Sequence, residues 1–174
     1  MKDLLALLII TTVLLCAGCS QNRNEFSDRR SDEVIAASAD LYQKFDSGNR
    51  IVYPDYYAGR YFSEDGKKLF INVTSAYNSE LDFLLEKYDC VEFGEVKYSK
   101  NELYSLSDQY KTELAYSFPE LEFFQPKLDE KDNCVFIELE LQTLENEDIM
   151  GKLKNHFNGK PVTFGEPSTN YLLD

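Results

Sequence analysis

The feature that most constrains the fold of this chain is a strand-like segment that occurs twice. VEFGEV occupies residues 91–96, and VTFGEP occupies residues 162–167. A second pair precedes the first, since LFINV at 69–73 matches VFIEL at 135–139. In LFINV and VFIEL the first, third and fifth positions are all aliphatic, which is typical of a strand with one face buried. The sequence therefore indicates a duplicated structural unit.

Each strand pair encloses a stretch with helical periodicity, at 78–89 and at 146–157. Asn78 or Ser79 is the expected cap of the first helix. A turn precedes each aliphatic strand, EDGK at 64–67 and DEKDN at 129–133, so each unit begins with a β-hairpin. The expected apolar stripes are Leu81, Leu84, Leu85 and Tyr88 in the first helix and Ile149, Leu153 and Phe157 in the second.

These patterns predict an α+β fold made of two related ββαβ units, at about 57–98 and 121–167. A helix over Ser99–Phe118 joins them, because Ser99 and Glu102 form a capping box and Pro119 ends the helix. A further helix precedes the first unit, with Val34, Ala37, Leu41 and Phe45 on one face. Two such units build an adequate core where one alone is marginal.

The N-terminus is typical of an exported protein. Residues 4–15 are apolar but too few to span a bilayer, which needs roughly 20. Residues 1–18 thus indicate a signal peptide, and 19–32 a flexible polar tether before the globular domain at 33–174. LCAGC at 15–19 resembles the lipobox of bacterial lipoproteins, with Cys19 as the lipid acceptor, although Cys16 stands where that family usually has Leu.

The resemblance to a lipoprotein implies a lipid anchor on Cys19. The chain is then expected at the cell membrane, facing the extracellular side of a Gram-positive cell or the periplasm. An ordinary secretory signal and a true anchor helix are the alternatives.

The overall charge narrows the choice of partners. The chain has 31 acidic against 18 basic residues, a formal net charge of −13. Such a surface repels phosphate backbones, so no nucleic acid is expected as a partner. Solubility outside the cell explains most of this charge, and a basic protein partner is the other interpretation.

Two cysteines remain after the signal region, Cys90 and Cys134. Outside the cytoplasm they could form a disulfide, but their spacing cannot show that they come within bridging distance. Two free buried thiols are the other alternative.

No catalytic, cofactor or metal residues are assigned from the sequence. The single histidine, His156, lies late in a helix between lysines and is expected to be a surface or helix-end residue. Glu138 and Glu140 share a strand face, where paired carboxylates could act as acid and base. DEKDN at 129–133 is interpreted as a solvated acidic turn, because it lacks the pattern of a calcium loop.

Three segments resemble a known family: YYAGRYFSEDGKKLFINVT, VKYSKNELYSL and LDEKDNCVFIEL. They are similar to the pro-region of chymotrypsin-like serine proteases of Gram-positive bacteria, the alpha-lytic protease and streptogrisin type, over about residues 52–167. The matching residues are Gly59, Tyr61, Gly66, Tyr98, Ser99, Glu102, Leu103, Asp129, Glu130, Lys131 and Asn133.

In that family a protease domain follows the pro-region, whereas here the sequence ends at Asp174, so the resemblance implies a stand-alone pro-region-like module. Pro-regions of the family assist the folding of their protease and inhibit it, by strand pairing and by placing their C-terminal tail in its active site. The docking tail would then be Tyr171, Leu172, Leu173 and Asp174.

The leading hypothesis is therefore a non-enzymatic protein-interaction module, an inhibitor or folding assistant of a secreted serine protease. A cell-surface ligand binder or hydrolase that uses acidic residues is the alternative, together with a purely structural envelope lipoprotein.

Overall fold

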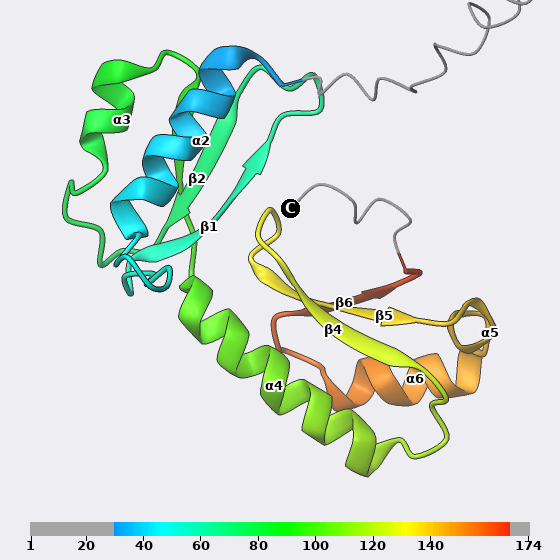
Figure 1. Cartoon of the computed structure of the whole chain (residues 1–174). Coiled ribbons are helices and arrows are strands. Elements are labelled where there is room, and N and C mark those ends of the chain that lie inside the picture. Colours follow the sequence, from blue (N-terminus) through cyan, green and yellow to red (C-terminus); the bar gives the residue numbers. More distant parts are fainter. Residues whose placement is uncertain (1–29, 168–174) are drawn as a thin grey trace, which may run out of the picture.

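The computed structural model describes residues 30–167, which form a mixed α+β fold with two three-stranded sheets. In Figure 1 each sheet has helices on one side only, and a long helix, α4, runs between the two halves. None of the helices within residues 30–167 is long and apolar enough to cross a membrane.

The first unit is built from α2 (Asp32–Phe45), β1 (Tyr57–Phe62), β2 (Leu69–Val73), α3 (Asp82–Lys87) and β3 (Val91–Glu95). Ser31 caps α2, since its hydroxyl accepts a hydrogen bond from the Val34 amide. β2 is the central strand, antiparallel to β1 and parallel to β3. The predicted turn at 64–67 lies between β1 and β2, and it contains Gly66 at φ 69°, a left-handed conformation that favours glycine.

The second unit is built from α4 (Lys100–Ser117), β4 (Phe124–Asp129), β5 (Cys134–Leu139), α5 (Leu141–Leu144), α6 (Glu147–His156) and β6 (Val162–Gly165). The predicted capping box starts α4, because Ser99 and Glu102 each bond the other's backbone amide. β5 is the central strand, antiparallel to β4 and parallel to β6. The two ββαβ units predicted from the sequence are therefore present.

The repeated segments occupy equivalent places in the two sheets. Leu69 pairs with Val91 in the first sheet, and Val135 pairs with Val162 in the second, so each match begins at the same register position. VEFGEV and VTFGEP each supply the third strand, parallel to the central one. The internal repeat read from the sequence thus has the same topology and register in both halves.

The two units have separate hydrophobic cores. The first lies between its sheet and helices α2 and α3, around Leu41, Ile71 and Leu84. The second lies between its sheet and helices α4 and α6, around Leu114, Ile137 and Leu153. No residue belongs to both clusters, so α4 is a part of the second unit rather than a neutral connector.

The structure corrects the sequence prediction at three helix positions. α3 is only six residues long, and neither Asn78 nor Ser79 caps it. Leu85, expected in the apolar stripe, is 44% exposed, because so short a helix buries only Leu84. Leu141, which continues the aliphatic alternation of VFIEL by two residues and would lie on the buried side of a longer strand, is 53% exposed, because β5 ends at Leu139 and Leu141 begins the short helix α5.

Candidate functional site

The tip of the β4–β5 hairpin is the place where the second unit reaches the first (Figure 1). It packs against a β-bulge in β1, where the pairing register with β2 shifts between Tyr57 and Gly59. Gly59 has φ 117°, and a Cβ atom there would lie 2.7 Å from the side chain of Glu130. Only glycine fits both that backbone conformation and that close approach.

Glu130 makes the central contacts of this tip. One carboxylate oxygen accepts a hydrogen bond from the Arg60 backbone amide at 2.6 Å. The other lies 2.5 Å from Nζ of Lys100, in the first turn of α4. The Glu130 carbonyl oxygen accepts from Nδ2 of Asn72 in β2 at 2.5 Å. This set, with Gly59, is called the hairpin contact below.

Lys100 is a buried cation, with only 5% of its surface exposed. Its Nζ lies 4.4 Å from the ring centre of Tyr53 and 5.8 Å from that of Tyr57, within the range of cation–π attraction. Burial by itself would lower the pKa of Lys100, but the charge and hydrogen bond of Glu130 outweigh it, so the pKa lies above its ordinary value. Lys100 therefore keeps its positive charge at neutral pH.

Tyr57 lies beside this pair and is fully buried, and its hydroxyl has no hydrogen-bond partner among residues 30–167. Burial, and after it the negative charge of Glu130, raises the pKa of Tyr57 well above its ordinary value. The phenol thus stays neutral next to the ion pair.

Two asparagines add contacts around the connection between β3 and α4. Asn133, at φ 49°, accepts a hydrogen bond from the Tyr98 amide and donates one to the Tyr98 carbonyl, at 2.9 and 2.7 Å. Asn101, on the exposed side of α4, donates to the Tyr53 carbonyl at 3.0 Å. The start of α4 is thus held against both units.

A groove of about 750 Å³ lies next to this junction, between the loops after β2 and β3 and the first turns of α4. Most of the residues around it have polar side chains, and its two acidic residues already have hydrogen-bond partners within the protein. Asp55 accepts from Asn101, and Glu102 accepts from the Ser99 amide. The residues around the groove are Asp55, Thr74, Ser75, Ala76, Lys97, Tyr98, Ser99, Asn101, Glu102, Ser105 and Leu106.

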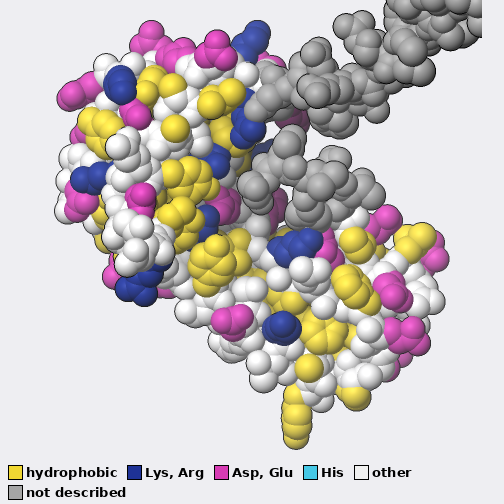
Figure 2. Space-filling model, in the orientation of Figure 1, with side chains coloured by type: hydrophobic (Ala, Val, Ile, Leu, Met, Phe, Trp, Pro, Cys, Tyr) yellow, Lys and Arg dark blue, Asp and Glu magenta, His cyan; other side chains and the backbone are white. Residues whose placement is uncertain are grey.

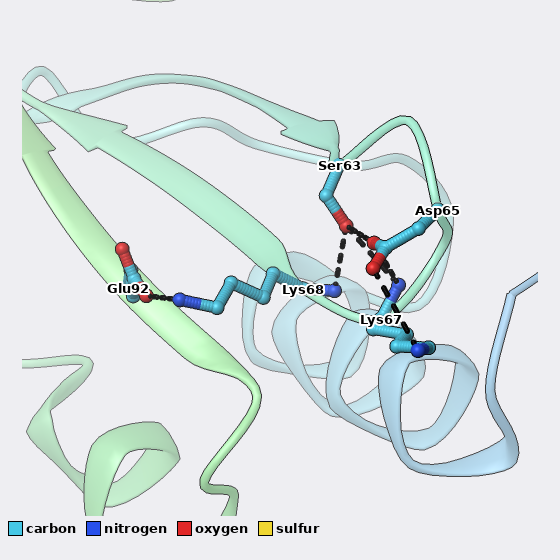
Figure 3. Close-up of polar contacts among 5 residues, drawn as sticks. All are labelled: Ser63, Asp65, Lys67, Lys68 and Glu92. Atoms are coloured by element: carbon cyan, nitrogen blue, oxygen red, sulfur yellow. Dashed lines mark hydrogen bonds and ion pairs between the residues drawn. The ribbon is translucent and has the colours of Figure 1, made fainter.

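The equivalent hairpin tip of the first unit has a different environment (Figure 3). There Asp65 accepts hydrogen bonds from the Ser63 hydroxyl and the Lys67 amide, and both acceptor and donors are exposed. Lys68 reaches across to Glu92 on β3, in an ion pair that is about half exposed at both ends. These contacts of the first hairpin stay within its own unit, as does the bond from the Ser31 amide to the Gly66 carbonyl, whereas the second hairpin contacts the other unit.

His156 belongs to a polar cluster that joins α4 to the end of α6. Its Nε2 and the Nζ of Lys160 both lie 2.7 Å from the same oxygen of Glu113. Partial burial opposes the ionisation of Glu113, but the hydrogen bonds from Lys160 and His156 outweigh it and lower the pKa of the carboxyl. His156 is thus a partly exposed helix-end residue, as the sequence indicated.

Cys90 and Cys134 are free thiols and lie in different units, so the disulfide considered from the sequence is not formed. Both are buried, and burial raises the pKa of both thiols. A raised pKa lowers the fraction of reactive thiolate.

The carboxylates singled out from the sequence do not form an acid–base pair. Glu138 is 1% exposed, and its carboxylate lies 2.8 Å from Nζ of Lys127. Glu140 instead precedes α5 and accepts a hydrogen bond from Gln142. Within residues 30–167 no three acidic, His or Cys side chains are grouped as metal ligands would be.

Acidic side chains are visible on both units, interspersed with lysine and arginine (Figure 2). The other residues proposed from the sequence, Cys19 and the tail Tyr171, Leu172, Leu173 and Asp174, lie outside the described residues.

No known family model matches the chain, and no curated protein matches it.

The sequence alone does not indicate the hairpin contact. The DEKDN segment at 129–133 was interpreted as a solvated turn, and that is wrong for Glu130, whose side chain is only 21% exposed. The available signal was the resemblance itself, because Gly59, Tyr98, Glu130 and Asn133 are all among its matching residues and all meet at the junction.

Gly59→Ala should lower the free energy of unfolding by roughly 1–3 kcal/mol, because the new Cβ meets Glu130 and the backbone becomes strained. Gly48→Ala is the matched control, since Gly48 also has positive φ but nothing within 4 Å of the added Cβ. Denaturant unfolding of both variants measures the difference. An equal cost at the two glycines would contradict the packing role of Gly59.

Glu113→Gln should flatten the acid side of the stability profile. The lowered pKa of Glu113 stabilises the folded chain at pH values above the ordinary 4.5 of a glutamate, and this stabilisation is lost as the pH falls through the lower value. Unfolding midpoints measured from pH 7 down to about pH 3 should fall less steeply for the variant. Parallel curves for the two proteins would exclude this contribution.

Proposed function

We propose that this protein is an exported protein-binding module that docks a partner through the open edge of its second sheet. The proposed partner is a secreted chymotrypsin-like serine protease, which the module inhibits or helps to fold. The observation that carries the proposal is the position of β6, a sheet-edge strand that leads directly into the tail after Pro167.

The hydrogen-bonding pattern of β6 supports strand addition. The Val135 amide on β5 donates to the Pro161 carbonyl at 2.9 Å. Since bonds in a parallel ladder involve alternate residues, Thr163 faces β5, and the backbone N–H and C=O of Phe164 point away from it. Such outward groups can pair with an added strand.

The resemblance to protease pro-regions supports the choice of partner. Two of its features, strand pairing and a tail placed in the active site, would both be served by β6 and residues 168–174. A sheet edge supplies affinity through its backbone groups, and a tail with Tyr171, Leu172 and Leu173 supplies side chains for the substrate pockets.

The alternative functions that use acidic residues, a ligand binder or a hydrolase, have less support. A hydrolase that uses two carboxylates needs them on either side of the scissile bond. Glu138 is buried against Lys127, and the acidic residues of the groove are bonded within the protein. The open strand edge is therefore the better basis for a function.

When the full mature chain is mixed with a panel of secreted chymotrypsin-like proteases, it should form a complex with at least one of them and inhibit that protease. A chain ending at Pro167 should inhibit that protease at least about tenfold less well, a loss of ~1.4 kcal/mol, because the tail no longer enters the active site. Inhibition constants for the two chains give this ratio.

Amide exchange identifies the docking edge in the same complex. The Phe164 amide should become protected on binding, whereas the Phe93 amide, at the equivalent position of β3, should not change. The proposal is wrong if no protease of the panel binds, or if a complex forms and Phe164 exchanges as in the free chain.

We also propose that Cys19 carries a lipid that holds the module at the cell surface. Cys19→Ser should move the protein from the membrane fraction to the medium, because a lipid chain contributes about 0.8 kcal/mol of membrane affinity per buried CH₂. Cys16→Ser is the matched control and should leave the protein in the membrane fraction. Membrane retention of the Cys19→Ser variant would refute the anchor.

A further inference from the structure

The two hydrophobic cores do not by themselves determine how the two units are placed relative to each other. Their hydrophobic cores share no residue, and each core is complete with its own helices. The strands of one sheet do not pair with those of the other. The relative position of the units must therefore depend on the contacts at the junction.

The polar contacts of the junction come from two elements of the second unit. The hairpin tip contributes Glu130, which bonds to the Arg60 amide and to Asn72. Helix α4 contributes Lys100, over the Tyr53 ring, and Asn101, which bonds to the Tyr53 carbonyl.

A junction of this kind has a small net stability. Forming a buried ion pair requires its charges to leave water, and this desolvation cancels much of their mutual attraction. When the junction separates, Lys100, Glu130 and Asn72 form hydrogen bonds with water again, and this hydration offsets part of the cost of opening. Apolar groups exposed in the same way would gain no such favourable hydration. The closed junction therefore has a defined geometry, but its free energy is only slightly lower than that of the separated units.

The chain supplies a hinge at the same place. Within residues 30–167, the units are linked covalently only between the end of β3 at Glu95 and the start of α4 at Lys100. The four residues between them are in neither a strand nor a helix. A few residues of this kind at the ends of elements can absorb the rotation of one rigid body against another.

We propose that the hairpin contact is a releasable closure between two rigid units, which separate about residues 96–99 without either unit unfolding. Release uncovers Gly59, Asn72 and the two charges of the pair. A ligand that presents a cation to Glu130 or an anion to Lys100 competes with the closure and shifts the equilibrium toward the open form. The proposal does not depend on the identity of the partner.

Native-state amide exchange on the full chain tests this closure through the Arg60 amide, which donates to Glu130. Asn101→Ala removes a contact on a different element, at an exposed helical position where alanine is favourable. If the junction opens as one unit, this variant should speed the exchange of the Arg60 amide at least about threefold. Asp108→Ala, an exposed change further along α4, is the matched control and should leave that rate unchanged.

Glu130→Ala should open the junction further and increase the radius of gyration measured by X-ray scattering. Amides of Ile71 and Ile137, in the two cores, should keep their protection in every variant. If Glu130→Ala does not fold, Glu130→Gln, which keeps the shape and loses the charge, replaces it in the same measurements.

Each result decides for or against the proposal. Faster Arg60 exchange in Asn101→Ala, with intact core protection and an expanded Glu130 variant, supports it. An unchanged Arg60 rate in Asn101→Ala, or a loss of protection at Ile71 together with Arg60, overturns it, because the junction would then be either uncoupled or part of global unfolding.

Discussion

The contact of Glu130 with the bulge of β1 is the interaction on which the arrangement of the whole molecule depends. Each ββαβ unit has its own core, so either could be complete without the other. The carboxylate of Glu130 accepts a hydrogen bond from the Arg60 amide and pairs with Lys100, and the backbone carbonyl of the same residue accepts a hydrogen bond from Asn72. Gly59 makes room for it, since any larger residue would fill the space of the Glu130 side chain.

Equivalent polar side chains in the two similar units have different hydrogen-bond or ion-pair partners. Asn72 and Glu138 occupy the same register position on the two central strands, opposite Gly94 and Gly165. Both side chains are polar, and both are buried. Asn72 bonds the other unit, whereas Glu138 pairs with Lys127 of its own sheet. A buried polar group must find a partner, and the two copies have met that requirement in different ways.

Local features of the fold were predictable because they depend on neighbouring residues. The cap at Ser31, the capping box of Ser99 with Glu102 and the positive φ of Gly66 each involve residues at most three positions apart. The errors occurred where packing decides. Leu81, Leu84 and Tyr88 of the predicted stripe are in the first core, but Leu85 is exposed, because α3 has only six residues and buries only Leu84. The junction was missed for the same reason, since Glu130 lies 70 residues from its partner Arg60.

The amino-acid sequence by itself determined the two units, their order of strands and helices, and their common register, because the alternation of aliphatic residues and the repeated segments act over short distances. Only the tertiary structure decided which of the two acidic hairpin turns packs against the other unit. Both turns are similar in composition, and burial depends on what the other unit places opposite each tip. For Glu130 that is a glycine bulge, a free backbone amide and a buried lysine, three groups from distant parts of the chain.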